Sequence, residues 1–272
     1  MSNAPPTPDP ARIRREPPRF RRVEVSRAEP VTPRLVRITL TGPELAGFAV
    51  SEPAASVRLL LPASDPADLV LPAWNGNEFL LAGGRRPTIR TFTPLRVDPD
   101  AFELDIEAVV HGNGIASRWA LSAAVGTPAA ISGPGRGYTI DRAAPAFLLA
   151  GDESALPAIR QLLAALPAAT PTRILVEVAR PDARLELGAH RSLAVEWLDL
   201  DAGAPPGDAL VAAVRATALD AGTRVWAAGE AAAVQRIRKH LFEERGIPRA
   251  HTTIRGYWKH GRAAGDDTPA NE

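Results

Sequence analysis

The chain has 272 residues, 45% of them hydrophobic, which is enough apolar material for one large domain or two medium ones. Its formal net charge of +1 gives no overall attraction to nucleic acid, so an anionic ligand must be recognised by a local cluster of cations. The absence of cysteine excludes disulfides, thiolate nucleophiles, zinc fingers and iron–sulfur ligation.

The two ends of the chain are predicted to be mobile tails. Residues 1–18 are rich in proline and arginine, and residues 263–272 are small and polar. The first stretch lacks the apolar core of a signal peptide, and no later run reaches the roughly 18 apolar residues of a membrane span. We therefore expect a cytoplasmic protein without a membrane span. We expect no nucleic-acid partner, because the basic leader carries a single aromatic residue, Phe20. We also expect a monomer, because nothing in the sequence suggests an obligate assembly.

Residues 19–141 have the pattern of an antiparallel β domain. In residues 34–40, apolar and polar side chains alternate, and residues 101–110 repeat this alternation. Such a period of two predicts strands with one buried face. Further short strands, separated by proline and glycine turns, are predicted at residues 56–62, 88–97 and 127–133. A run of short strands of this kind predicts a small barrel or sandwich.

Residues 142–262 have a different pattern, in which compact apolar strands alternate with helical stretches. Strands are predicted at residues 146–151, 172–179, 193–200 and 223–229. Helices are predicted at residues 154–166, 208–219 and 230–246. This alternation indicates βαβ units and a parallel sheet covered by helices. The predicted fold is therefore an antiparallel barrel followed by a doubly wound, Rossmann-like α/β domain.

The stretch "RTFT" at residues 90–93 carries side chains that suit a flavin. Arg90 and Phe92 share one face of the predicted strand, and Thr93 points the other way. A flavin needs a flat apolar or aromatic surface, a donor near its reactive edge and a cation for its phosphates. On these four residues alone, a barrel strand with an exposed arginine is the better interpretation.

The stretch "HGNGIASRWA" at residues 111–120 follows a predicted strand and opens a helix. Gly112 and Gly114 permit close backbone approach, and the amides of residues 115–117 would point at an anion such as a pyrophosphate. The alternative is a plain strand-to-helix turn in which Ser117 helps to cap the helix. His111 has no second histidine or acid at ligand spacing, so no metal site is predicted.

The order of these motifs resembles the siderophore-interacting protein family, the NAD(P)H-dependent ferric siderophore reductases of the ferredoxin reductase superfamily. The resemblance implies a FAD-binding barrel at residues 19–141, packed on a nicotinamide-binding domain at residues 142–262. The stretches that carry it are "RTFTPLRVD" (90–98), "ELDIEAVVHGNGIASRWA" (103–120), "ISGPGRGY" (131–138), "LLAGDESALPAI" (148–159), "WAAGEAAAV" (226–234) and "GYWKHG" (256–261).

The resemblance also implies roles for single residues of the barrel. Arg90 would hold the FAD phosphates, Phe92 would lie against the flavin, and Thr93 would reach the reactive edge of its ring. The superfamily usually has tyrosine where this chain has Phe92, so stacking should persist while a hydrogen bond from a phenol is lost. The family's phosphate-binding turn matches His111, Gly114, Ala116 and Ser117.

A nicotinamide cofactor is expected at two places in the second half. Gly151, Asp152 and Glu153 follow an apolar strand and precede a helix, where a dinucleotide would approach the amino end of that helix. An ordinary strand-to-helix crossover is the alternative. The resemblance adds Gly229 and Glu230, which end the family's late strand behind the nicotinamide.

The electron donor is left open by the sequence. Arg180 and Arg184 would suit the 2′-phosphate of NADPH, whereas Glu177 would hydrogen-bond the ribose of NADH. A reduced ferredoxin is a third candidate.

Basic residues are expected around the substrate. Only two of the 32 basic residues are lysines, Lys239 and Lys259. The resemblance places Lys259, Arg249 (with Arg245 as an alternative) and Arg58 around a siderophore site. For each residue alone, a solvated surface charge is the commoner explanation. Together they suit a ferric siderophore, because many such complexes are anionic and rich in oxygen.

The function expected from the resemblance is the reduction of ferric siderophores to release ferrous iron. A hydride would pass from NAD(P)H to FAD, and single electrons would pass from FAD to Fe(III). Neither a catalytic acid–base residue nor a metal ligand of the protein is expected. The alternatives are a general flavin or ferredoxin-type reductase and a non-catalytic siderophore-binding protein. The siderophore type is not readable from the sequence.

Overall fold

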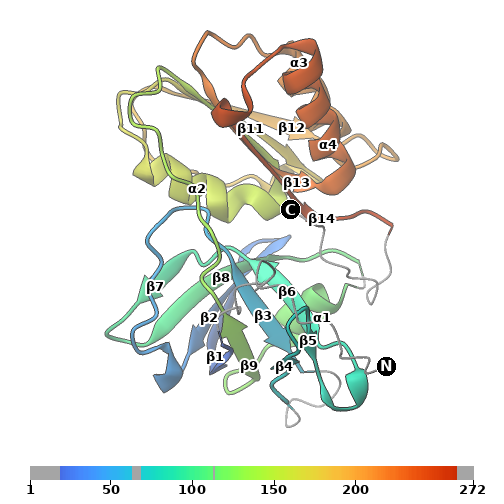
Figure 1. The fold of residues 1–272 in the computed structure, drawn as a ribbon. Helices are drawn as coiled ribbons and strands as arrows, with labels where there is room; N and C mark the ends of the chain where they lie inside the picture. The colour runs from blue at the N-terminus through green and yellow to red at the C-terminus, as the bar shows by residue number, and fades with distance from the viewer. Residues whose placement is uncertain (1–18, 63–68, 113, 262–272) are drawn as a thin grey trace, which may run out of the picture.

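Two large β-sheets of different type form most of the described structure, one antiparallel with seven strands and one parallel with five (Figure 1). The computed structural model describes residues 19–62, 69–112 and 114–261. The predicted tails at residues 1–18 and 263–272 lie outside the described residues. The predicted fold, an antiparallel barrel-like domain followed by a doubly wound α/β domain, is confirmed.

The antiparallel sheet has the strand order β6-β3-β9-β1-β2-β8-β7. Alternate residues such as Ile38, Leu40 and Leu104 are fully buried inside it, as the period of two predicts. The strands are β1 (Arg21–Thr32), β2 (Leu35–Thr41), β3 (Val57–Leu61), β6 (Thr88–Phe92), β7 (Arg96–Asp98), β8 (Glu103–Val109) and β9 (Pro128–Ser132). Smaller elements are the pair β4 (Ala73–Trp74) and β5 (Phe79–Leu80), the 3₁₀ turns η2 (Pro43–Leu45) and η4 (Ala82–Gly84), and helix α1 (Ile115–Ser122).

The stretch at residues 88–97, predicted as one strand, is two strands in the structure. Pro94 lies between β6 and β7, and proline cannot donate a hydrogen bond to a strand ladder. The two strands form opposite edges of the sheet although three residues separate them. Because the four residue steps from Phe92 to Arg96 span at most about 14 Å, the two edges must lie near each other. The sheet is therefore curled into a half-barrel.

The parallel sheet has the strand order β12-β11-β10-β13-β14. Helix α2 covers the face toward the half-barrel, and α3 and α4 cover the other face (Figure 1). The strands are β10 (Phe147–Asp152), β11 (Thr172–Val178), β12 (Leu193–Asp199), β13 (Arg224–Glu230) and β14 (Thr252–Trp258). The helices are α2 (Leu156–Ala165), α3 (Asp208–Ala216) and α4 (Ala231–Lys239), with the turns η5 (Glu153–Ala155), η6 (Pro181–Ala183), η7 (His240–Glu244, a π turn) and η8 (Arg249–His251).

The strand order changes direction at the centre of this sheet, where β10 lies between β11 and β13. The carboxyl ends of β10 and β13 therefore form a topological switch point, the usual place for a ligand in an open α/β sheet. Strand β14 is a fifth strand that the sequence pattern did not predict. Because β14 runs parallel to β13, its last residues, "GYW", lie on the same side of the sheet as the carboxyl ends of β10 and β13.

Ion pairs and hydrogen bonds join the two sheets. The buried carboxylate of Glu107 on β8 accepts from Arg37 on β2 at 2.7 Å and from Arg160 on α2 at 3.0 Å. Gln161 of α2 donates to the carbonyl of Pro94 at 2.6 Å. Helix α2 is thus held directly on the half-barrel. None of the helices in the described part of the chain combines the length and the apolar character that a membrane crossing requires.

Candidate functional site

Strand β6 presents the two side chains predicted to suit a flavin. Its register against β3 pairs Arg90 with Leu59 and Phe92 with Val57. Arg90 and Phe92 therefore lie on one face of the sheet. Both are partly exposed, and Phe92 packs against the core of the half-barrel. Arg90 Nη1 donates to the carbonyl of Ile89 at 2.8 Å, which holds the guanidinium against its own strand. A cation and an aromatic surface are thus presented side by side.

Thr93 lies at the seam between the two sheets. It is 7% exposed, and its hydroxyl forms a hydrogen bond with the phenol of Tyr257 at the end of β14. Burial raises the pKa of Tyr257 from its ordinary value of 10 to about 12. No sequence pattern predicted this contact, because the two residues are far apart in the chain.

The turn between β8 and α1 leaves the amino end of a helix accessible. Gly112 has a φ of +44°, a conformation that favours glycine, and nothing lies within 4 Å of the position of an added Cβ. Gly114 is the N-cap of α1, and no side chain caps this end. The neighbouring residues Ile115 and Ala116 are partly exposed. Such an amino end attracts an anionic oxygen through its amide groups and the helix dipole.

Ser117 shapes this turn from inside the protein. Its buried hydroxyl accepts from the amide of His111 at 3.1 Å and donates to the carbonyl of Val109 at 3.2 Å. His111 itself is exposed, and its ring lies 6.0 Å from the ring of Trp258. The hydroxyl of Ser117 therefore closes the turn between β8 and α1 and does not cap the helix.

Asp152, at the end of β10, is a buried anchor for three neighbouring residues. Its Oδ1 accepts from the amide and the hydroxyl of Ser154. Its Oδ2 accepts from the amide of Glu230 at 2.9 Å and from the indole N–H of Trp258 at 2.7 Å. Burial raises the pKa of Asp152, while the hydrogen bonds from Ser154, Trp258 and Glu230 oppose this rise. Both oxygens are occupied by donors of the protein.

Glu153 joins the switch point to the half-barrel. Its carboxylate forms an ion pair with Arg34, with two Nε distances of 2.9 Å, and it accepts from the amide of Ala179 at 3.1 Å. Arg34 lies in the turn between β1 and β2, and Ala179 follows β11. Glu153 therefore connects three chain segments and is buried at 7% exposure.

The glycines at the switch point are required by packing within the protein. A Cβ on Gly229 would lie 2.5 Å from Asp152 Oδ2, and a Cβ on Gly151 would lie 2.4 Å from the Cβ of Ala155. The neighbouring Glu230 is buried, accepts from the amide of Ala233 at the start of α4, and accepts from the amide of His260 at 3.1 Å. These contacts explain both glycines without a ligand.

The residues considered for cofactor choice all have partners in the protein. Glu177 is buried and accepts from the amides of Gly207 at 2.6 Å and Leu210 at 3.0 Å, so its carboxylate holds the start of α3. Burial raises its pKa. Arg180 and Arg184 lie on the surface and form exposed ion pairs with Asp182 and Asp199.

The end of β14 brings two aromatic residues to the seam. In the pairing of β14 with β13, Gly256 lies opposite Gly229 and Trp258 lies opposite Glu230. Tyr257 therefore has no partner of its own in β13 and forms a β-bulge. Bulges re-aim side chains and are common beside active sites. The only signal in the sequence was the motif "GYWKHG", which the resemblance used for its lysine alone.

The basic residues predicted around the substrate do not form one cluster. Arg58 is exposed on β3 opposite Thr91, on the face of the sheet away from Arg90. Lys259 is exposed just after β14, whereas Arg249 precedes this strand and lies over the ring of Phe242 at 4.8 Å. Because a seven-residue strand is about 23 Å long, Arg249 and Lys259 lie at opposite ends of the parallel sheet.

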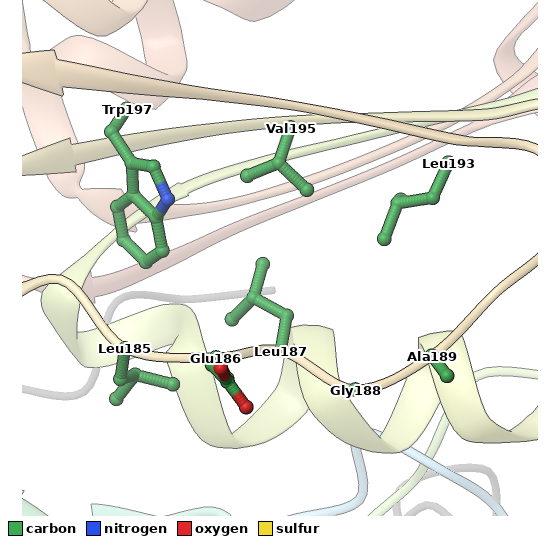
Figure 2. Close-up of a pocket in the computed structure, with 8 residues that line it drawn as sticks. All are labelled: Leu185, Glu186, Leu187, Gly188, Ala189, Leu193, Val195 and Trp197. Atoms are coloured by element: carbon green, nitrogen blue, oxygen red, sulfur yellow. The ribbon is translucent and has the colours of Figure 1, made fainter.

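A pocket of about 450 Å³ lies away from these residues, between β12 and the loop that precedes it. Figure 2 shows Leu193, Val195 and Trp197 pointing from alternate positions of β12 toward this loop, with Leu187 pointing back at them. Glu186 is the one charged residue of its lining. The pocket thus offers no cation to an anionic ligand.

Two family models match consecutive parts of the chain. The model of the siderophore-interacting FAD-binding domain matches residues 24–138, and the model of the siderophore-interacting protein matches residues 144–261. The first contains β6 and the α1 turn, and the second contains the switch point and Lys259.

Curated relatives and a solved structure agree with this match. The ferric vibriobactin reductase ViuB of Vibrio cholerae is 29% identical, with 89% of this chain and 90% of that protein covered. The NADPH-dependent ferric-chelate reductase of Escherichia coli is 30% identical, with 95% and 99% covered. The crystal structure of a siderophore utilization protein from T. fusca has a TM-score of 0.81 and 34% identity, with 92% of this chain and 97% of that chain covered.

Proposed function

Because this chain belongs to the siderophore-interacting protein family, we propose that it binds FAD and reduces ferric siderophores with electrons from a nicotinamide cofactor. One observation carries the proposal. A cation, an aromatic surface and an uncapped helix amino end all lie within the part that matches the family's FAD-binding domain. We place the boundary between the FAD half and the nicotinamide half at residues 141 and 142, just before β10.

The half-barrel residues fit FAD as a ligand. Arg90 and the amino end of α1 would hold the phosphates, since a guanidinium and uncapped amides both favour phosphate oxygens. Phe92 would lie against the flavin ring, and as a phenylalanine it contributes surface without a hydrogen bond. Thr93, next to it in the chain, would reach the reactive edge of the ring while Tyr257 contacts its hydroxyl. In this proposal Ser117 and His111 shape the phosphate turn.

NADPH is the proposed electron donor, and the switch point is its proposed site. The Escherichia coli relative is named as NADPH-dependent. The carboxylate of Glu177 is buried at the start of α3 and is not presented to a ribose. Arg180 and Arg184 are exposed, and surface ion pairs such as theirs contribute little, so either guanidinium can exchange its carboxylate for a 2′-phosphate.

The chemistry proposed for this site follows from the ligand preferences of iron. FAD supplies the conversion of a two-electron hydride into single electrons. One NADPH then reduces two ferric ions, giving NADP⁺, one proton and two ferrous ions. Hard oxygen ligands hold ferric ion far more tightly than ferrous ion, so reduction releases the iron. The protein side chains therefore need to perform no chemical step of their own. In this proposal they bind and orient the two cofactors and the chelate, and they hold the two sheets in a fixed relative position.

The proposal is tested by following both halves of the reaction without oxygen. FAD-loaded protein is mixed with NADPH, and the loss of the oxidised flavin absorbance is recorded. A ferric siderophore is then added together with a ferrous-specific chelator. We expect the flavin absorbance to return as the ferrous complex forms, with both catecholate and hydroxamate siderophores as test substrates.

Three results would contradict the proposal in different ways. No flavin absorbance after incubation with excess FAD would rule out the cofactor. Reoxidation by free flavin but by no ferric siderophore would indicate a general flavin reductase. Binding of a ferric siderophore without reoxidation of chemically reduced protein would indicate a carrier.

A further inference from the structure

Two buried carboxylates hold the chain on either side of Lys259. The indole N–H of Trp258 donates to Asp152 Oδ2 at 2.7 Å, and the amide of His260 donates to Glu230 Oε1 at 3.1 Å. Asp152 and Glu230 end the neighbouring strands β10 and β13, and both are less than 10% exposed. The segment of residues 258–260 is therefore fixed at both ends to the switch point.

Lys259 lies between these two fixed points and is exposed. Among the residues that the structure describes, its side chain takes part in no ion pair or hydrogen bond. A lysine has a long flexible side chain, so an exposed ammonium usually loses entropy when it binds a ligand. A backbone held on both sides reduces the part of this cost that comes from the main chain.

Neither carboxylate forms an ion pair with Lys259 in the described part of the chain, because their oxygens accept hydrogen bonds from other groups. Asp152 accepts four hydrogen bonds, two of them from Ser154. Glu230 is the N-cap of α4, and the amino end of a helix carries partial positive charge. Both carboxylates thus serve as acceptors, and the exposed charge of this segment is that of the lysine.

Trp258 also places the segment beside the half-barrel. Its ring lies 6.0 Å from the ring of His111 and 6.3 Å from the ring of His260. His111 belongs to the turn that leads to the accessible amino end of α1. The carboxyl end of β14 accordingly lies against the antiparallel sheet (Figure 1). A ligand that contacts Lys259 would therefore lie near the proposed flavin site.

We propose that Asp152, Glu230 and Trp258 are positioning residues that fix Lys259 for contact with a negatively charged ferric chelate, an inference that rests on the proposed function. The three residues act through Lys259 and need not touch the chelate. The β-bulge at Tyr257 contributes to this positioning, because it brings Trp258 opposite Glu230. Without the bulge, the residue opposite Glu230 would be Tyr257.

The test measures chelate binding to the oxidised, FAD-loaded protein by calorimetry, with no electron donor present. The probes are a triply negative ferric tris-catecholate and a neutral ferric trihydroxamate. The main variant is Trp258→Phe, which removes the indole N–H and keeps an aromatic ring. Asp152→Asn is a second variant that weakens the acceptor. Lys239→Ala, on α4, removes the chain's other exposed lysine and is the matched control.

We expect Trp258→Phe and Lys259→Ala each to weaken binding of the anionic chelate by about threefold to tenfold, and the effect to shrink at high salt. In the Lys259→Ala background, Trp258→Phe should cause no further loss. The neutral chelate and Lys239→Ala should show no change. FAD content and the midpoint of thermal unfolding, recorded for each variant, should stay at the wild-type values for Trp258→Phe.

Two results would overturn the proposal, and they are distinguishable. If Lys259→Ala weakens binding but Trp258→Phe has no effect, or has its full effect in the Lys259→Ala background, the positioning role is wrong while the proposed function stands. If the wild-type protein binds neither ferric chelate, the proposed function itself is wrong, and this inference is lost with it.

Discussion

The half-barrel and the switch point of the parallel sheet differ in how they use their polar groups. In the half-barrel, Arg90 is partly exposed, and the amino end of α1 has no side-chain cap. At the switch point, Asp152 and Glu153 are buried, and their carboxylates accept hydrogen bonds from the protein itself. Both regions were predicted to bind cofactors, yet the first leaves Arg90 and the amino end of α1 partly exposed, whereas the second buries its carboxylates and uses them to hold strands together.

This difference shows why motif residues need not be contact residues. A carboxylate with both oxygens occupied by backbone and side-chain donors stabilises the shape of a site. Its mutation would lower activity indirectly, through the position of other groups. The following predictions separate these two kinds of residue.

The largest expected effect is that of Gly229→Ala at the switch point. The new Cβ would lie 2.5 Å from Asp152 Oδ2, at a φ of +151° that favours glycine. We expect the free energy of unfolding to fall by about 3 kcal/mol or more. Urea denaturation measures this loss.

The matched control for Gly229 is Gly203→Ala. Gly203 also has a positive φ, of +84°, but nothing lies within 4 Å of its Cβ position. Gly203→Ala should therefore lower the free energy of unfolding only through backbone strain, by about 1 kcal/mol. Equal losses at the two positions would show that the contact with Asp152 contributes nothing.

The second prediction concerns Arg90→Ala in the half-barrel. Removing a charge-assisted contact to phosphate should weaken FAD binding by about 1.5 to 3 kcal/mol, with little change in unfolding of the protein without flavin. Fluorescence titration with FAD measures the affinity. Arg85→Ala, in the exposed stretch before β6, is the control and should leave FAD binding unchanged. An unchanged affinity for Arg90→Ala would contradict the assignment of its role.

A smaller effect is expected at the seam, where Tyr257→Phe should change how the free energy of unfolding depends on pH. Burial raises the pKa of Tyr257 from its ordinary value of 10 to about 12. Between these two pH values the folded protein keeps a proton that the unfolded chain has released, so stability falls as the pH rises. The wild-type protein should lose about 2 kcal/mol more than Tyr257→Phe across this window. Parallel pH profiles of urea denaturation would refute the burial of the phenol at the seam.

The smallest effect is expected from single basic residues at the surface. Arg58→Ala should weaken binding of an anionic ferric siderophore by about 1 kcal/mol or less, and added salt should reduce the difference. Arg249→Ala should have no effect, because Arg249 lies at the other end of β14 from Lys259. Calorimetric titrations at low and high salt measure both. A loss for Arg249→Ala equal to that for Arg58→Ala would show that the chelate is recognised elsewhere.

The predictable part of the fold lies in segments with a clear periodicity. Strand β8 alternates Leu104 and Ile106 with acidic residues, and strand β10 is apolar up to its last residue, Asp152, so their types follow from local pattern. Strand β14 has neither pattern, because it is a half-buried edge strand with a bulge at Tyr257. It was therefore missed, and with it the seam between the two sheets.

In the site, as in the fold, only features that follow from local sequence patterns could be predicted. The shared face of Arg90 and Phe92 follows from the alternation of a strand, which needs no tertiary information. The occupation of Asp152 by Trp258, 106 positions further along the chain, depends on which strands become neighbours in the parallel sheet. The same holds for Glu153 and Arg34, which are separated by 119 positions.

The sequence by itself determined the two types of sheet, the shared face of Arg90 and Phe92 on β6 and the glycine turn before α1, because each follows from the local pattern of residues close together in the chain. Only the tertiary structure decided which polar groups stay accessible and which form hydrogen bonds or ion pairs within the protein. The reason is physical: a buried carboxylate must find donors, and the donors of Asp152, Glu153 and Glu230 come partly from segments that only folding brings within hydrogen-bond distance.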